Sequence, residues 1–178
     1  ESDTPDLPRL RDALEKAADQ TLRAGQISRR LRDFVARGES EPRIESLPKA
    51  IEEAGVLALI GAIERGVRVQ YRLDRRVDLV LADKVQIQQV LVNLMRNAIE
   101  AMQVSDRREL TVSAVPFKGG MVEVSIADTG PGISPDIAER LFQPFFTTKS
   151  QGMGVGLSIS RTIVEAHGGQ IRVETNDK

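Results

Sequence analysis

The segment VQIQQVLVNLMRNAIEAM, residues 85–102, constrains the fold of this chain more than any other part of the sequence. Its apolar residues recur at intervals near 3.6, which is typical of a helix that buries one face. The buried side is predicted to consist of Val85, Ile87, Val90, Leu91, Leu94, Ala98 and Ile99. Asp83 lies just ahead of the segment, where an aspartate can cap a helix. We therefore predict one helix that begins directly after Asp83.

Strand signals lie on both sides of this helix. Alternating apolar residues occur in VRVQYRL and VDLVLA before it and in ELTVSAV and MVEVSIAD after it, the last two joined by a turn around Lys118, Gly119 and Gly120. Further helices are predicted over residues 46–63, capped by Ser46, and over residues 155–166, and QIRVET predicts a last strand. This order predicts an α+β sandwich with one sheet and one helical layer. The final TNDK has the composition of a turn, so we expect a closing strand beyond it.

The N-terminal part has a different pattern. Apolar and small residues recur at steps of three and four from Leu7 to Val35, which predicts one long helix over about residues 5–37. Pro5 and Pro8 suit its first turn, and Gly38 suits its end. Because such a seam cannot be buried by one helix alone, a bundle or dimer arm is favoured over a helix folded back on its own domain. The predicted domains are residues 1–40 and 41–178.

Composition excludes few classes of function. The net charge is −1, from 25 basic and 26 acidic residues, so it gives no reason to predict nucleic acid or a membrane surface as partner. The chain has no cysteine, which fits a reducing compartment, and we expect a cytoplasmic location. Its longest apolar stretches are far shorter than the ~20 residues that span a bilayer.

Three stretches carry groups suited to binding. Asn93, Asn97 and Glu100 share one face of the predicted helix, and Mg²⁺ prefers such oxygen ligands, although these could be ordinary solvated positions. In IADTGPGI, residues 126–133, Asp128 at a strand end could accept a hydrogen bond from the amino group of a base, although Asp and Gly also suit a plain turn. In GMGVGLS, residues 152–158, glycines at a helix start expose N–H groups to phosphate, and Lys149 is near enough to reach it.

Two classes of nucleotide site do not fit these glycines. No buried strand precedes them, as a dinucleotide fold requires, and the P-loop order G-x-x-x-x-G-K is absent. The loop LFQPFFTTK, residues 141–149, holds three of the five phenylalanines within five residues, namely Phe142, Phe145 and Phe146. Such a cluster suggests a lid that docks by apolar anchors, with ordinary core packing as the alternative.

Taken together, VLVNLMRNAIEAM, DTGPGI, LFQPFFTTK and GMGVGLSIS resemble, in order and spacing, the N, G1, F and G2 boxes of the ATP-binding domain of sensor histidine kinases. The resemblance covers roughly residues 46–174. It implies the Bergerat, or GHKL, fold, a two-layer α/β sandwich shared with gyrase, Hsp90 and MutL. RAGQISRRLRDFVARGE also resembles the second helix of the dimerisation and phosphotransfer domain in oxygen-sensing kinases of the FixL type.

The resemblance also implies residue roles. Asn97 would be the Mg²⁺ ligand, with Asn93 and Glu100 beside it, and Asp128 would recognise adenine. A lid would extend from about Ser134 to Met153, and Lys149 would meet phosphate. The implied binding residues are Asn93, Asn97, Glu100, Asp128, Gly130, Gly132, Ile133, Lys149, Gly152, Gly154, Val155, Gly156 and Leu157, of which Asn97 and Lys149 are the catalytic candidates.

The implied activity is transfer of the γ-phosphoryl group of Mg·ATP to a histidine, for relay to a response regulator by a homodimer. Hydrolytic relatives place a glutamate base where this chain has Asn93, and an amide cannot abstract a proton, so a hydrolase is disfavoured. The family's acceptor histidine lies on an upstream helix that this chain does not contain. The only histidine, His167, precedes two glycines at a helix end, and we predict a structural role for it. The alternative function is a nucleotide-binding regulatory or dimerisation module without kinase activity.

Overall fold

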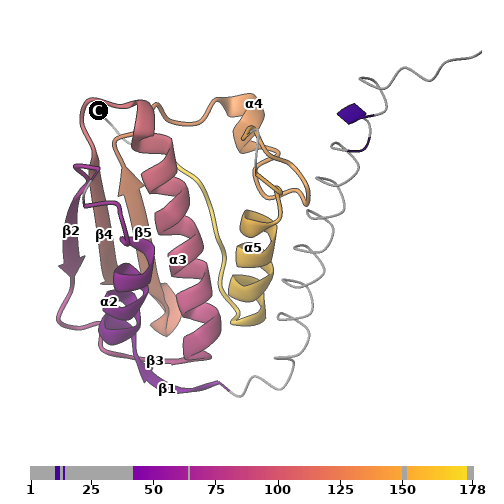
Figure 1. Ribbon diagram of the computed structural model, residues 1–178. Coiled ribbons are helices and arrows are strands. Elements are labelled where there is room, and N and C mark those ends of the chain that lie inside the picture. Colours follow the sequence, from indigo (N-terminus) through magenta and orange to yellow (C-terminus); the bar gives the residue numbers. More distant parts are fainter. Residues whose placement is uncertain (1–10, 13, 15–41, 64, 150–151, 176–178) are drawn as a thin grey trace, which may run out of the picture. The chain divides into compact units, whose positions relative to one another are not determined.

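The computed structural model describes residues 11, 12, 14, 42–63, 65–149 and 152–175 (Figure 1). The chain divides into two units, Glu1–Ser40 and Glu41–Lys178. In the first unit Arg11, Asp12 and Leu14 are helical, and the rest of the helix predicted over residues 5–37 lies outside the described residues. The assignment of residues 1–40 to a dimerisation domain therefore stays a prediction.

The second unit is built from two small sheets and three principal helices. The strands are β1 (Arg43–Ser46), β2 (Arg68–Leu73), β3 (Leu79–Ala82), β4 (Glu109–Pro116) and β5 (Val122–Asp128). The helices are α2 (Leu47–Ala58), α3 (Lys84–Ala101), the short α4 (Pro135–Ala138) and α5 (Gly156–Ala166), with 3₁₀ turns at Met102–Val104 and Lys118–Gly120. This is the predicted α+β class, but the described strands form two sheets rather than the single sheet that was predicted.

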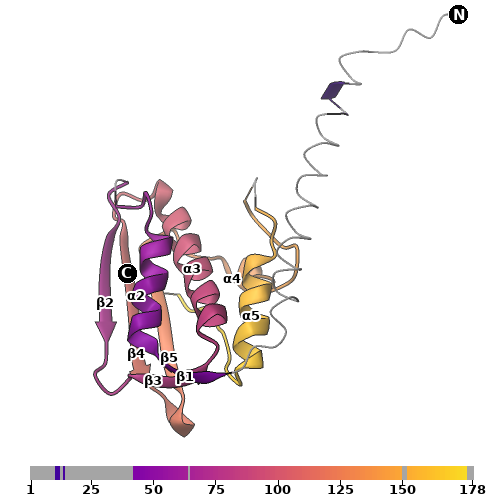
Figure 2. The ribbon, with the colours of Figure 1, turned by 60° about the horizontal axis from the view of Figure 1, so that its bottom comes forward.

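The strands pair as one three-stranded sheet, in the order β2-β4-β5, and one two-stranded sheet, β1-β3. β4 and β5 form the predicted antiparallel hairpin, in which Leu110 lies opposite Asp128. β2 is parallel to β4, with α3 in the connection between them. Figures 1 and 2 show α2 and α3 on one face of this sheet and α5 beside α3.

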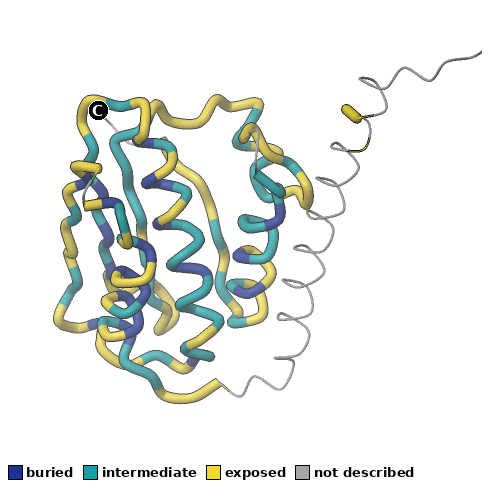
Figure 3. Tube along the Cα trace, viewed as in Figure 1, coloured by how far each residue is buried: buried dark blue, intermediate teal, exposed yellow. Residues whose placement is uncertain are grey.

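The core lies between the three-stranded sheet and the two helices α2 and α3 (Figure 3). Its fully buried side chains include Ile51 of α2, Met95 of α3 and Leu110 and Val112 of β4. Burial of side chains of this size stabilises a fold by about 1.5–3 kcal/mol each. This core fixes the position of α3, which carries most of the polar residues of the candidate site.

The cap predicted for α3 is confirmed, because the Asp83 carboxylate accepts a hydrogen bond from the Gln86 N–H at 2.9 Å. The apolar face differs from the prediction at three positions, because Leu94 is only half-buried and does not belong to the core. Val85 is 48% exposed, whereas Met95 is fully buried. Val85 belongs to the first turn of α3, and Met95 completes the buried face with Leu91 and Ile99.

Other predicted boundaries need correction. α2 ends at Ala58 rather than Ile63, because turns with i→i+3 hydrogen bonds replace the helix after Leu59. Ser46 precedes α2, but its hydroxyl makes no capping bond and instead donates to Asp78 at 3.4 Å. β1, with the sequence RIES, was not predicted, because four mostly polar residues carry no strand signal.

The strand predicted for QIRVET is absent from the structure. Residues 171–175 form no backbone ladder, and their alternation buries no apolar face, since Val173 is 36% exposed. The segment contacts β5 through an ion pair between Arg172 and Glu123 at 2.6 Å. Side-chain contact thus replaces the backbone pairing that the prediction required.

Candidate nucleotide site

One face of α3 brings together the stretches that the sequence analysis singled out. Asn93 and Asn97 are half-buried and Glu100 is exposed, so this face is polar and accessible in part. Three segments that lie 29 or more residues further along the chain contact it: the loop after β5, the segment before α5, and the start of α5. Because the polar residues of α3 are spaced three and four apart, they follow one another along this face, and the three segments contact the face in the corresponding order.

At the centre of this face, Lys149 bridges two of the predicted site residues. Its Nζ donates to Asn97 Oδ1 at 2.8 Å and to Glu100 Oε2 at 2.5 Å. Lys149 lies 49 residues beyond Glu100 in the sequence, so the pair joins the segment predicted as a lid to α3. Both side chains are roughly half exposed, at 44% and 50%, so the ion pair contributes little to stability. Its importance is that it places a cation on these two oxygen atoms.

At the start of α5, the glycine segment lies against Asn93. The Nδ2 of Asn93 donates to Ser160 Oγ at 2.9 Å. A Cβ added to Gly156 would lie 2.5 Å from Asn93 Oδ1, so only glycine allows this approach. Val155 is buried and Leu157 is half-buried, which anchors the beginning of α5. The N-terminus of α5 therefore lies beside the polar face of α3.

At the other end of this face, Asp128 and its loop approach the last turn of α3. Asp128 accepts a hydrogen bond from the Gly130 N–H at 2.8 Å. A Cβ at Gly130 would come within 2.7 Å of Asp128 Oδ1 and 3.2 Å of the Ala101 Cβ. Gly132 has φ +83°, which favours glycine, and Ile133 is 40% exposed. The glycines thus permit a close turn between β5 and α3.

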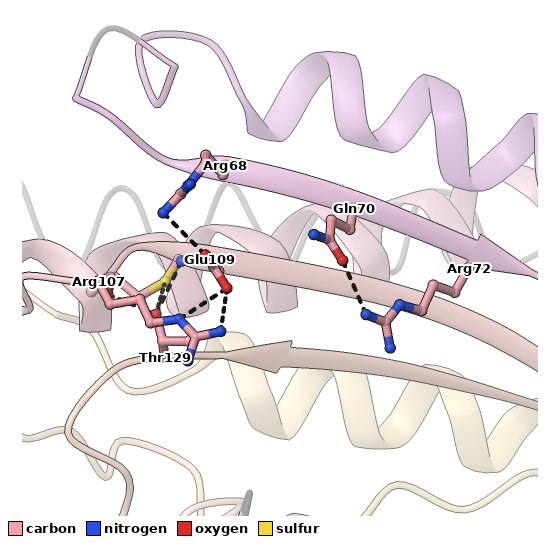
Figure 4. Close-up of polar contacts among 7 residues, drawn as sticks. Arg68, Gln70, Arg72, Arg107, Glu109 and Thr129 are labelled. Atoms are coloured by element: carbon pink, nitrogen blue, oxygen red, sulfur yellow. Dashed lines mark hydrogen bonds and ion pairs between the residues drawn. The ribbon is translucent and has the colours of Figure 1, made fainter. Parts of the chain in front are cut away.

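Thr129 anchors this turn, a role that the sequence analysis missed. Its hydroxyl donates to the Arg107 carbonyl at 2.6 Å and accepts from the Glu109 N–H at 3.0 Å (Figure 4). These bonds tie the residue after Asp128 to the start of β4. In a DTG sequence the threonine looks like an ordinary turn residue, and only the pairing of β4 with β5 indicates its partner.

The same corner contains a network of charged side chains. Glu109 pairs with Arg107 at 2.5 Å and with Arg68 at 3.1 Å, and on the same sheet Arg72 donates to Gln70 at 3.1 Å (Figure 4). The hydrogen bonds from Arg107 lower the pKa of Glu109, and its carboxylate stays charged near neutral pH. This network supports the Thr129 anchor rather than the site itself.

The segment predicted as a lid has little regular structure. It contains α4 and a run of turns, and residues 150 and 151 are not described. Phe146 lies under the Arg140 guanidinium at 4.4 Å, whereas Phe145 is 65% exposed. Phe145 also has φ 64°, a conformation that is strained for a bulky residue.

Two glycines allow this segment to fold tightly. A Cβ at Gly154 would lie 2.5 Å from the carbonyl carbon of Phe145, and one at Gly152 would lie 2.5 Å from Thr147 Oγ1. Each glycine therefore contacts a residue of the preceding loop. The glycines before α5 thus shape the segment around Lys149 as well as the start of the helix.

His167 lies at the opposite end of α5 from the glycines. Its Nε2 accepts a hydrogen bond from the Asp83 N–H at 3.0 Å, so Nε2 carries no proton. The proton is therefore on Nδ1, which donates to the Ile163 carbonyl at 2.8 Å. Gly168 follows with φ 73°, and the Gly169 N–H bonds the Val164 carbonyl at 2.9 Å. His167 thus joins the end of α5 to the start of α3, as a structural residue would.

The described residues include no cluster of three or more His, Cys, Asp or Glu side chains that could hold a metal ion by themselves. None of the described helices is both long and apolar enough to cross a membrane. Two pockets, of about 330 and 440 Å³, are lined by residues outside the predicted site.

Comparisons with known proteins show the family of this chain. The sequence profile of the family described as histidine kinase-, DNA gyrase B-, and HSP90-like ATPase matches residues 82–178. The sensor protein FixL of Bradyrhizobium diazoefficiens is 62% identical over 98% of this chain and 35% of its own length. The C4-dicarboxylate transport sensor protein DctS of Rhodobacter capsulatus is 41% identical over 94% of this chain and 26% of its own.

Solved structures give the same result. The catalytic domain of the histidine kinase ThkA matches with a TM-score of 0.69 and 36% identity, over 77% of this chain and 89% of that domain. ThkA in complex with the response regulator protein TrrA matches with a TM-score of 0.72 and 28% identity, over 99% of this chain and 50% of that chain. The chain spans about a third of the length of FixL and a quarter of that of DctS. It belongs to the histidine kinase-, DNA gyrase B-, and HSP90-like ATPases, as an ATP-binding catalytic domain of the sensor histidine kinase type.

Proposed function

We propose that this chain binds Mg·ATP on the polar face of α3 and transfers the γ-phosphoryl group to a histidine on an upstream helix. The observation that carries the proposal is the bridge from Lys149 to Asn97 and Glu100, because it joins three predicted site residues from two distant segments. The loop after Asp128 and the start of α5 lie at the two ends of the same helical face. A nucleotide laid along α3 would therefore meet a base acceptor at one end and backbone N–H groups at the other.

The donor set on α3 fits Mg²⁺. Asn97 Oδ1 and the Glu100 carboxylate are hard oxygen atoms, and both already hold a cation in the form of the Lys149 ammonium. Mg²⁺ is commonly bound by one or two protein oxygens together with phosphate and water, which agrees with the lack of a larger acidic cluster among the described residues. When bound, the ion would neutralise charge on the phosphates. Asn97 would hold it, with Glu100 beside it.

The residues of this chain would act chiefly by positioning and by charge. Lys149 would move its ammonium from Glu100 to a phosphate oxygen, and the α5 N-terminus would bind the phosphate chain through its N–H groups. Asp128 would accept a hydrogen bond from the adenine amino group, with Gly130, Gly132 and Ile133 around it. Asn93 cannot remove a proton from water, which supports phosphoryl transfer over hydrolysis.

His167 is a poor acceptor for the phosphoryl group. Both of its ring nitrogens are engaged in hydrogen bonds with main-chain groups of Ile163 and Asp83. A nucleophilic nitrogen needs an available lone pair, and the only one, on Nε2, accepts the Asp83 N–H. The acceptor is therefore proposed to be a histidine on the upstream helix, and the final recipient an aspartate of a response regulator. The complex of ThkA with TrrA supports this choice of partner.

The test uses this chain and a longer chain that includes the upstream helix, both incubated with γ-labelled ATP. We expect the chain alone to bind Mg·ATP without labelling itself, and the longer chain to be labelled. Asn97→Ala in the longer chain should abolish the label, with Gln88→Ala on the α2 side of α3 as the matched control. Stoichiometric label on His167 would contradict the proposal. Binding without label in the longer chain would favour a regulatory module instead.

A further inference from the structure

Ser160 is the one described residue with a buried polar side chain, at 2% exposure. It lies in the middle of α5 on the side that packs against α3, and the other buried residue of the helix is Ile163. Alanine would fill this position with a better helix propensity and without a polar atom to satisfy. The hydroxyl therefore requires an explanation beyond packing.

The partner of this hydroxyl is Asn93, on the polar face of α3. Ser160 Oγ accepts the Asn93 Nδ2–H at 2.9 Å, across 67 residues of sequence. Gly156 lies one turn before Ser160 on α5, and the Asn93 Oδ1 is directed toward it, 2.5 Å from where a Cβ would be. Two small residues of α5, four apart, thus form a slot that receives the Asn93 amide.

The direction of this amide decides what Asn93 can bind. With Nδ2 held by Ser160, the carbonyl oxygen Oδ1 faces the N-terminus of α5, and it can accept a hydrogen bond from water or contact a cation. In the opposite orientation the NH₂ group would face that space and could only donate. A neutral hydrogen bond of about 0.5–1.5 kcal/mol corresponds to roughly a two- to tenfold higher population of the amide held in this slot, so loss of the Ser160 hydroxyl would let the Asn93 amide leave this position.

We propose that Ser160 is a positioning residue, which holds the Asn93 amide with its oxygen toward the metal and phosphate part of the nucleotide site. The inference rests on the proposed function, because that function places Mg²⁺ and phosphate beside Asn93 and the α5 glycines. Ser160 itself touches neither nucleotide nor metal and acts only through Asn93.

The experiment is calorimetric titration of the full 178-residue chain with a nonhydrolysable ATP analogue, with Mg²⁺ and again with EDTA. Because the oriented oxygen matters only when the cation is present, Ser160→Ala should weaken binding roughly three- to tenfold with Mg²⁺ and less than about twofold with EDTA. Thr162→Ala is the control, since the exposed Thr162 hydroxyl on the same helix donates to the Ser158 carbonyl at 3.1 Å and lies beyond the phosphate-binding stretch. It should leave both affinities unchanged.

A double-mutant cycle with Asn93→Ala then separates positioning from packing. In the Asn93→Ala background, Ser160→Ala should cause no further loss of Mg²⁺-dependent affinity. Equal losses with Mg²⁺ and with EDTA, additive losses in the double variant, or no loss at all would each overturn the role of Ser160. Failure of the unaltered chain to bind the analogue in either condition would instead refute the proposed function.

Discussion

The two faces of α3 are built in different ways. The inner face is apolar and packs on α2 and the sheet through Leu91, Met95, Ala98 and Ile99. The outer face carries Asn93, Asn97 and Glu100. Three later segments of the chain contact it through hydrogen bonds and through glycines that lie close to the helix. One side of the helix thus stabilises the fold, and the other side carries the groups proposed to bind the nucleotide. Substitutions on the two faces should therefore affect different measurements.

The largest effect is expected on the inner face. Met95 is fully buried in the core, and Met95→Ala should lower the free energy of unfolding by about 2–5 kcal/mol, because the lost side chain leaves a cavity. Urea denaturation followed by circular dichroism measures this change. Met121→Ala is the matched control, since Met121 is 41% exposed and its truncation should change stability little. Similar losses for both methionines would contradict the assignment of the core.

The next effect belongs to the outer face. Asn97→Ala should weaken Mg²⁺-dependent nucleotide binding by at least about tenfold, because a charge-assisted contact is lost. The unfolding midpoint should stay close to that of the unaltered chain, since the bond from Lys149 to Asn97 is exposed. A large loss of stability without a loss of affinity would show that Asn97 belongs to the core instead.

The sequence predicts the inner face of α3 well because its information is local. A periodicity near 3.6 and the capping Asp83 define the helix, and alternation with a glycine turn defines the β4–β5 hairpin. β1 and the parallel pairing of β2 with β4 could not be predicted in this way. β1 is short and polar, and its stability comes from pairing with β3, 36 residues later. The segment after Gln170 shows the opposite error, because alternation alone does not create a partner strand.

The outer face could be predicted only in part. The motifs named Asn93, Asn97, Asp128 and Lys149, because each carries a chemical group of obvious use. Thr129 and Ser160 were missed, since their partners are defined by tertiary contacts to β4 and α3. A serine in a helix and a threonine in a turn look ordinary until the helices and strands are packed together.

A smaller effect is expected at the junction of the two helices. His167→Ala removes the acceptor of the part-buried Asp83 N–H and should lower the free energy of unfolding by about 1 kcal/mol. Nucleotide affinity should change less than about twofold, because the ring lies at the far end of α5 from the glycines. Glu165→Gln, which removes only an exposed pair with Arg161, serves as the control in both assays. A selective loss of affinity in His167→Ala would contradict the structural role.

The smallest effect belongs to neither face of α3. Hydrogen bonds from Arg76 lower the pKa of Asp74 from 3.8 to about 2. A carboxyl whose pKa is lower in the folded chain stabilises the fold above its unfolded pKa, and this contribution is lost as the pH falls from about 4 to about 2. Asp74→Asn should therefore flatten the pH dependence of stability in that window only, as measured by acid titration. An altered slope near neutral pH would contradict this assignment.

The most direct test of the central claim, that the outer face of α3 binds the metal nucleotide, is paramagnetic broadening by Mn²⁺ bound with an ATP analogue. In an NMR spectrum of the chain, the side-chain amide signals of Asn97 and Asn93 should broaden first, and both should recover when EDTA is added. The ring signals of His167 should stay sharp. Broadening of His167 with sharp Asn97 signals would contradict the account.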